Sequence, residues 1–185
     1  MKRSEIRQHI IETASYLFYK NGYNLTGINE IIAEAVIAKA TLYNHFKSKE
    51  DICLAYLQFR NTTFLEEIKR FCFSKPKGQE QVLALFDFLQ LFFKDKDFNG
   101  CWCIKTVAEI PREEERIRKE IKGQKEAFLG LIGKILAANV ELEAGMQDTV
   151  ARKVYLLYES AVAESHLHQE DWPISSARQL TEMII

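Results

Sequence analysis

Proline and glycine are scarce in this sequence, with 3 prolines and 8 glycines among 185 residues. These residues mark turns and helix breaks, so a chain made of many short strands would need more of them. Alternating apolar and polar residues, the pattern of a half-buried strand, are also missing, as are internal repeats and low-complexity tracts. We therefore expect an all-α protein.

Long apolar runs are absent as well. No stretch of about 18–20 consecutive apolar residues occurs, so no membrane span is expected. Arg7, His9 and Glu12 interrupt the first apolar segment, which excludes a secretory signal there. We expect a cytoplasmic protein with no membrane partner, in which the 4 cysteines remain thiols.

Neither sign of charge is in excess. The chain has 25 Lys and Arg against 26 Asp and Glu, a formal net charge of −1, which argues against a generally basic, histone-like protein. Residues 1–50 nevertheless hold 7 basic and 5 acidic residues. The slight positive excess therefore lies at the N-terminal end. A hydrophobic fraction of 47% is ample for a packed core and argues against disorder.

Apolar residues recur at helical spacing along the chain and predict about nine helices. The first is expected to end at Asn21-Gly22, because glycine tolerates the left-handed conformation of a helix end. The second should be capped by Thr26, and the third should cover about 38–44. Further helices are expected at 48–74, with Ser48 as its cap, and then at 79–93, 101–110, 112–136, about 148–167, and from about 171 onward.

The stretch "AKATLYNHFKSKED" (38–51) is too polar for a core helix and too rich in helix signals for a loop. It follows a short helix after a tight turn at 35–37, which is the arrangement of a helix-turn-helix unit whose second helix enters the major groove. Leu42 and Phe46 are four residues apart and should face inward. The side chains left outside are the candidate DNA contacts: Lys39, Thr41, Asn44 and His45, with Tyr43, Lys47 and Lys49 suited to phosphates.

Residues 4–56 resemble the DNA-binding domain of the TetR family of bacterial transcriptional regulators. The resemblance rests on "ETASYLFYKNGYNLT" (12–26), "INEIIAEA" (28–35) and "TLYNHFKSKEDI" (41–52). It implies a homodimer that binds palindromic double-stranded DNA and releases it when a small molecule enters the C-terminal domain. It also implies a phosphate contact at Thr26. The function it predicts is transcriptional regulation, most readily repression, without catalysis or a cofactor.

The turn departs from the family pattern. Members often carry Ala-Gly-Val-Ser there, whereas this chain has Ala35-Val36-Ile37-Ala38. The recognition helix thus loses a serine cap, which costs roughly 1 kcal/mol, and Val36 occupies a position where a positive φ strains a branched side chain. An interaction module that has lost DNA binding is therefore one alternative interpretation.

The expected organisation is a DNA-binding domain at 1–47 and a ligand-binding and dimerisation domain at 48–185. The segment "FNGCWCIKTVAEI" (98–110) resembles a family subset with Gly-Cys at the start of the sixth helix. Aromatic and thiol residues at helical spacing either line a ligand pocket or fill the core: Phe64, Phe86, Phe92, Cys101, Trp102, Cys103, Tyr155 and Tyr158. The candidate dimer residues lie on the eighth helix: Val154, Leu157, Tyr158, Ala161, Val162 and Ser165.

The pair Cys101 and Cys103 permits three further interpretations. With His166 and His168 it has the residue types of a zinc site, but Cys-x-Cys at a helix start splays the thiols, so no metal is expected. A second interpretation is plain burial. The third is a thiol sensor of electrophiles or oxidants, because a helix N-terminus favours a thiolate. A thiol- or metal-dependent enzyme would need a nucleophile–base pair or a di-metal motif, and neither is evident.

Overall fold

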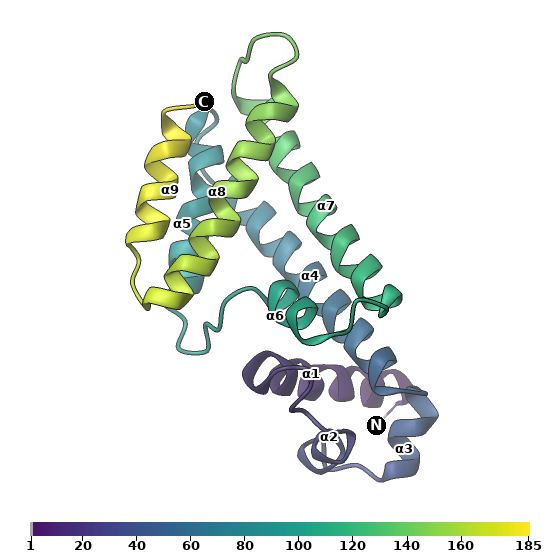
Figure 1. Cartoon of the computed structure of the whole chain (residues 1–185). Coiled ribbons are helices and arrows are strands. Elements are labelled where there is room, and N and C mark those ends of the chain that lie inside the picture. Colours follow the sequence, from purple (N-terminus) through teal and green to yellow (C-terminus); the bar gives the residue numbers. More distant parts are fainter. Residues whose placement is uncertain (1) are drawn as a thin grey trace. The chain divides into compact units, whose positions relative to one another are not determined.

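The computed structural model describes residues 2–185, and in that range it contains nine helices and no strand (Figure 1). The predicted all-α fold and the predicted order of helices are confirmed. The helices are α1 (Arg3–Asn21), α2 (Ile28–Glu34), α3 (Lys39–His45), α4 (Lys49–Phe73), α5 (Gln79–Phe93), α6 (Trp102–Glu109), α7 (Glu115–Asn139), α8 (Gln147–His168) and α9 (Trp172–Glu182).

The chain divides into two compact units. Unit 1 combines the residues up to Thr63 with Trp102–Gly123, and unit 2 combines Phe64–Cys101 with Gln124–Ile185. The long helices α4 and α7 each contribute one part to unit 1 and the other to unit 2. The helix-turn-helix segment thus shares its unit with α6 and with the beginnings of α4 and α7. A functional boundary at residue 47 stays a prediction.

The three N-terminal helices form their core from the apolar stripes that the sequence predicts. Ile10 and Ala14 of α1, Ile31 of α2 and Leu42 of α3 are fully buried. Helix α1 ends as expected at Gly22, which has φ +96° and donates its N–H to the carbonyl of Phe18 at 3.0 Å. We call residues 2–47 the reading head.

The predicted cap of α2 is wrong. Gly27 is the cap residue, and its N–H donates to Glu30 Oε2 at 3.3 Å. Thr26 is buried instead, and its hydroxyl donates to the carbonyl of Gly22 at 2.8 Å. The hydroxyl therefore holds the loop after α1 rather than the first turn of α2. Periodicity alone could not distinguish these two neighbouring positions.

The turn between α2 and α3 carries the strain that its sequence predicts. Val36 has φ +52° and is 89% exposed, so a branched side chain adopts a left-handed conformation without compensating burial. This conformation costs about 1–2 kcal/mol in a non-glycine residue. His9 of α1 contacts this turn from outside it, with its Nε2 3.0 Å from the carbonyl oxygen of Ala35. Ala38 provides no side-chain cap for α3.

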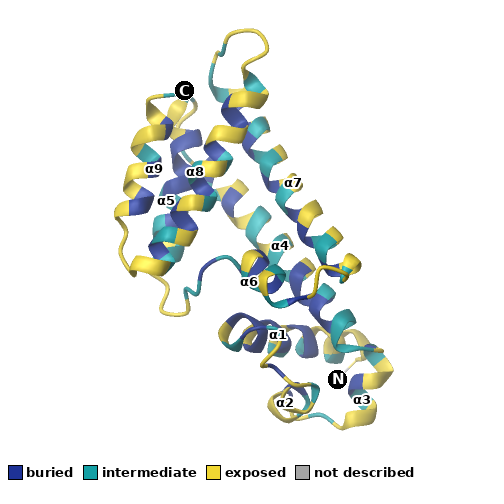
Figure 2. Cartoon of the chain, viewed as in Figure 1, coloured by how far each residue is buried: buried dark blue, intermediate teal, exposed yellow. Residues whose placement is uncertain are grey.

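Unit 2 is built on α5, which packs against α8 and α9 (Figures 1 and 2). Its residues from Gln81 to Phe86 are all buried, which confirms α5 as a core helix, although Leu91 near its end is 56% exposed. Helix α7 starts at Glu115, three residues later than predicted. The reason is a turn after Pro111, whose carbonyl accepts the N–H of Glu114 at 3.2 Å.

Candidate DNA-binding surface and C-terminal sites

Helix α3 has one inward and one outward face, as expected. Leu42 and Phe46 are 0% and 3% exposed and anchor the helix to the reading head. Asn44 is exposed, and Tyr43 is 44% exposed. Lys39 is exposed at the start of the helix, whereas Thr41 and His45 are half-buried on its flanks. A polar face of this kind can meet base edges and phosphates in a major groove.

The segment after α3 presents two lysines in different environments. Lys47 is exposed. Lys49 is half-buried: its Nζ lies 4.5 Å from the ring centroid of Tyr23 and 3.4 Å from the carbonyl oxygen of Asn24. Burial lowers the pKa of Lys49, with Glu109 acting in the opposite direction. Lys47 is therefore the more available cation for a phosphate.

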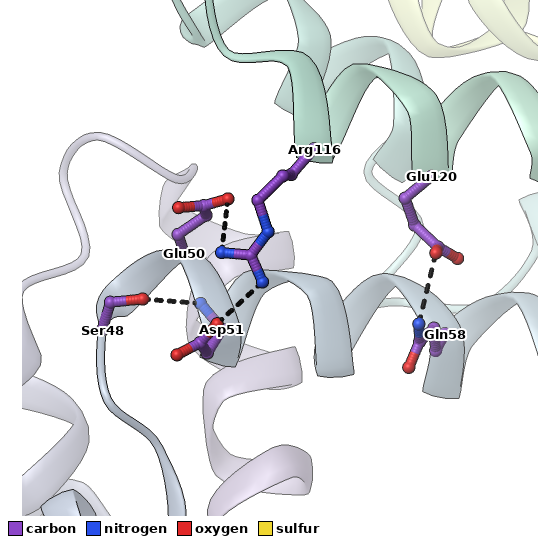
Figure 3. A network of polar contacts seen from close by, with 6 residues as sticks. All are labelled: Ser48, Glu50, Asp51, Gln58, Arg116 and Glu120. Carbon is purple, nitrogen blue, oxygen red and sulfur yellow. Dashed lines mark hydrogen bonds and ion pairs between the residues drawn. The ribbon is translucent and has the colours of Figure 1, made fainter.

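Ser48 caps α4 as predicted, since its Oγ accepts the N–H of Asp51 at 3.1 Å (Figure 3). Thr26 differs from the exposed candidates for phosphate contacts. Because its side chain is 0% exposed, a phosphate contact at Thr26 would have to use the backbone. That contact stays a prediction.

Unit 2 contains six of the eight candidate pocket residues, and three of them pack against Phe128. The Phe128 ring centroid lies 4.9 Å from that of Tyr158, 5.1 Å from Phe64 and 6.1 Å from Tyr155. Phe86 reaches the cluster through Tyr158 at 5.9 Å. We call these five rings the aromatic cluster. Phe128 was not predicted to be the centre of this cluster, because the apolar residues of one helix do not show which of its rings other helices surround.

The remaining candidates lie elsewhere. Phe92 packs on Phe98 at 5.3 Å between ring centroids. Trp102 and Cys103 are buried in unit 1, where the Arg60 guanidinium stacks 5.2 Å from the Trp102 ring. A separate groove of about 380 Å³ in unit 2 involves none of the candidates. It is lined by Leu129, Gly130, Gly133, Lys134, Ala137, Gln147, Asp148, Ala151 and Arg152.

Cys101, the residue directly before α6, belongs to a charged cluster in unit 2 that the sequence did not reveal. Lys125 Nζ donates to Cys101 Sγ at 3.1 Å and to the two carboxylate oxygens of Glu159 at 2.6 and 2.7 Å. Burial raises the pKa of Glu159, and Lys125 partly opposes that shift. One ammonium group is thus shared between a carboxylate and a thiol: the ammonium favours a thiolate at Cys101, whereas the Glu159 carboxylate opposes it.

The other cysteines differ from Cys101. Cys53, Cys72 and Cys103 are at most 2% exposed, whereas Cys101 is half-buried. Burial raises the pKa of both Cys53 and Cys72 to about 12. Within residues 2–185 no group of three or more His, Cys, Asp or Glu side chains is arranged to hold a metal ion. His168 instead pairs with Glu164 at 3.3 Å.

The candidate dimer residues on α8 face their own chain. Val154, Tyr158, Ala161, Val162 and Ser165 are each at most 6% exposed, and Leu157 is half-buried. Both Val154 and Tyr158 are therefore used in the core of unit 2. The exposed track is a different set at helical spacing: Leu156, Ser160, Ala163 and Leu167.

No helix in residues 2–185 has the length and apolar content that crossing a bilayer requires. The fold and the outward face of α3 define the class of protein as a helix-turn-helix DNA-binding regulator. Residues 10–56 match the family model described as "Bacterial regulatory proteins, tetR family". Residues 10–56 therefore form a TetR-family DNA-binding domain, and the chain is a DNA-binding transcriptional regulator.

Several known proteins are similar to this chain over most of their length. The chain is 26% identical to SCO4454, a TetR-family transcriptional regulator from Streptomyces coelicolor, with a TM-score of 0.87 over 100% of this chain and 94% of that one. It is 21% identical to the HTH-type transcriptional repressor NemR from Escherichia coli (strain K12), covering 98% of this chain and 94% of that protein. The fatty acid metabolism regulator protein from Bacillus subtilis (strain 168) is 25% identical, covering 83% and 78%.

Proposed function

We propose that the protein is a repressor that binds a palindromic operator as a homodimer and releases it when a small molecule binds unit 2. The observation that carries the DNA-binding part is the outward face of α3, where Tyr43 and Asn44 are exposed opposite the buried Leu42, with Lys47 exposed just after the helix. Relatives described as repressors, NemR among them, support the sign of regulation.

Selection of genomic fragments followed by footprinting tests this function. We expect protection of a two-fold symmetric site whose half-sites lie one helical turn or a multiple apart, about 34–36 Å per turn. The experiment is run at two salt concentrations, because specific binding keeps its preference over random DNA while both affinities fall with salt. Protection of one isolated half-site by a monomer would contradict the proposal, and equal affinity for all fragments would favour the lost-binding interpretation.

The dimer surface proposed here is the exposed track on α8 together with the exposed apolar residues of α9. Leu156 and Leu167 are 64% and 72% exposed, and Leu180 on α9 is 48% exposed. The small residues Ser160 and Ala163 lie between the two leucines and permit close helix approach. Because α8 and α9 pack against each other, two copies of this helix pair would form a four-helix bundle.

The aromatic cluster is the proposed ligand-binding region of unit 2. Its rings meet edge-on, so a ring face is available for packing against an apolar or aromatic molecule. Phe64 and Tyr155 are half-buried members and thus the natural points of entry. Ligand binding would shift the population toward a spacing of the two reading heads that no longer fits successive major grooves.

A second candidate function, a thiol sensor of electrophiles, is favoured by the 3.1 Å contact between Lys125 Nζ and Cys101 Sγ. With an α,β-unsaturated carbonyl, the Cys101 thiolate would add to the β-carbon and form a C–S bond. The electrons of the C=C bond move to the α-carbon, which then takes a proton from water. No oxidant is required for this step, and the adduct would displace Lys125 from the sulfur.

Alkylation rates at neutral pH test the sensor. Cys101 is expected to react at least about tenfold faster than Cys53 or Cys72, because burial holds the pKa of each of these two near 12. Lys125→Ala should slow the reaction at Cys101, and Cys101→Ser should keep the operator bound when the electrophile is added. Equal rates at all four thiols, or release of DNA from Cys101→Ser, would exclude this mechanism and leave a reversible ligand as the trigger.

A further inference from the structure

Two helices from later in the chain hold the reading head inside unit 1. Helix α6 contacts the loop after α1, and the start of α7 contacts the start of α4. None of these pairs is close in sequence, since they join residues 62 to 86 positions apart. The contacted segments are those that carry predicted phosphate contacts, the loop at 22–26 and the segment at 47–51.

Glu109 at the end of α6 forms hydrogen bonds with the loop that leads into α2. Its Oε2 accepts the N–H of Asn24 at 2.7 Å, and its backbone carbonyl accepts from Asn24 Nδ2, also at 2.7 Å. A Cβ at Gly22 would displace the Glu109 carboxylate, and the φ of +96° at Gly22 would strain any other residue. Lys105, one turn earlier, donates to the carbonyl of Tyr19 at 2.9 Å.

Arg116 in the first turn of α7 forms ion pairs with the N-terminal residues of α4 (Figure 3). Its Nη1 lies 2.9 Å from Glu50 Oε1, and its Nη2 lies 3.0 Å from Asp51 Oδ1. The Arg116 hydrogen bond lowers the pKa of Asp51, with Ser48 as a further cause. Further along the same two helices, Gln58 Nε2 of α4 donates to Glu120 Oε2 of α7 at 3.2 Å.

These contacts matter for DNA because of where the charges lie. Glu50 and Asp51 follow Lys47 and Lys49 directly, so two carboxylates lie next to lysines that are predicted to meet phosphates. The guanidinium of Arg116 neutralises one of the two charges and orients both groups. Without it, the carboxylates would repel the phosphates and compete for the lysines.

We infer that Glu109 and Arg116 are positioning residues for operator binding. Glu109 fixes the loop that carries Thr26, and Arg116 fixes the start of α4 while neutralising the carboxylates there. The inference rests on the DNA-binding role of the reading head. Since Arg116 is more than half exposed, its ion pairs contribute little to the free energy of unfolding. The two residues should therefore affect affinity for DNA much more than stability.

The test compares operator affinity and thermal unfolding for Glu109→Ala and Arg116→Ala in the full-length chain. The matched controls are Glu113→Ala and Arg112→Ala, which remove the same charges from exposed neighbouring positions. We expect each test variant to bind the operator about tenfold more weakly, comparable to losing one charge-assisted hydrogen bond. The unfolding temperature should stay within the range of the controls.

Three readouts separate positioning from a merely structural role. Glu109→Gln should restore affinity, because its amide oxygen can still accept the Asn24 N–H. The defect of Arg116→Ala should shrink as salt increases, because it arises from repulsion that salt screens. Combining Arg116→Ala with Glu50→Gln and Asp51→Asn should restore affinity by removing the uncompensated carboxylates.

Test variants that bind the operator as well as the two controls would overturn the inference. A loss of affinity that follows a parallel loss of thermal stability, with no rescue by the conservative or combined variants, would overturn it too. If the parent protein bound no DNA, the DNA-binding function itself would fail and this inference with it. Because the parent is measured first, the two failures are distinguishable.

Discussion

Replacing Leu167 with arginine is expected to convert the homodimer into monomers and to weaken operator binding by about 10²–10⁴-fold. Leu167 is 72% exposed on the outward track of α8, so its side chain is not needed for the core of its own chain. In a two-fold interface the same leucine is buried twice, and burying a leucine contributes about 1.5–3 kcal/mol. An arginine at this position would instead place two like charges in an apolar contact.

The loss of DNA binding follows from the loss of linkage between the two reading heads. A dimer makes the second half-site contact intramolecular, which raises overall affinity by about 10²–10⁴-fold over a single head. The monomeric variant should therefore still bind DNA weakly, with the affinity of one head. Sedimentation measures the oligomeric state, and titration with the operator measures the affinity.

A matched control for this prediction is Leu91→Arg, which introduces the same charge at a 56% exposed leucine of α5. It should remain dimeric and bind the operator like the parent. Ala161→Arg does not serve as an interface test, because Ala161 is 2% exposed and its replacement would disrupt the core of unit 2. A Leu167→Arg protein that stayed dimeric in sedimentation would show that the dimer uses another surface.

Helix positions could be predicted because each helix has its own apolar stripe and end signals. Gly22 after α1, Ser48 before α4 and Pro111 after α6 are local features that determine boundaries without knowledge of the fold. Where two neighbouring residues could serve equally well as a cap, as Thr26 and Gly27 could for α2, apolar spacing cannot distinguish them. Apolar spacing likewise does not show the turn after Pro111 that delays the start of α7.

Faces and partners could not be predicted where they depend on long-range packing. Helix α8 carries apolar residues on more than one side, and only the position of α5 and α9 decides that Val154 and Tyr158 face inward whereas Leu167 faces outward. The contacts of Arg116 with Asp51 and of Lys125 with Cys101 join residues 65 and 24 positions apart. Charged residues at such separations look like ordinary surface residues in the sequence. By contrast, the outward face of α3 follows from one short helix, so it was predictable.

Removing the Lys47 ammonium and removing the Asn44 amide should have different effects on DNA recognition. Lys47 is exposed after the end of α3 and is assigned to a phosphate, so Lys47→Ala should weaken binding to every sequence alike. It should also reduce the slope of log affinity against log salt by about one, the value for one lost phosphate contact. Tyr43→Phe should weaken binding uniformly with no change in this slope, because it removes a neutral donor.

Asn44 lies at the centre of the outward face of α3, where an amide can bind a base edge through two hydrogen bonds. Asn44→Ala should therefore change which base is preferred at one position of each half-site, by about 1–3 kcal/mol of discrimination, and leave the salt slope intact. Lys69→Ala, an exposed lysine of α4 outside the reading head, is the control for charge removal alone. The measurement is a titration of the operator and of single-base variants at several salt concentrations. Lys47→Ala could instead alter the base preference while its salt slope matched that of Lys69→Ala. In that case the phosphate contact assigned to Lys47 and the base contact assigned to Asn44 would have to be exchanged, because only a group that contacts a base gives specificity.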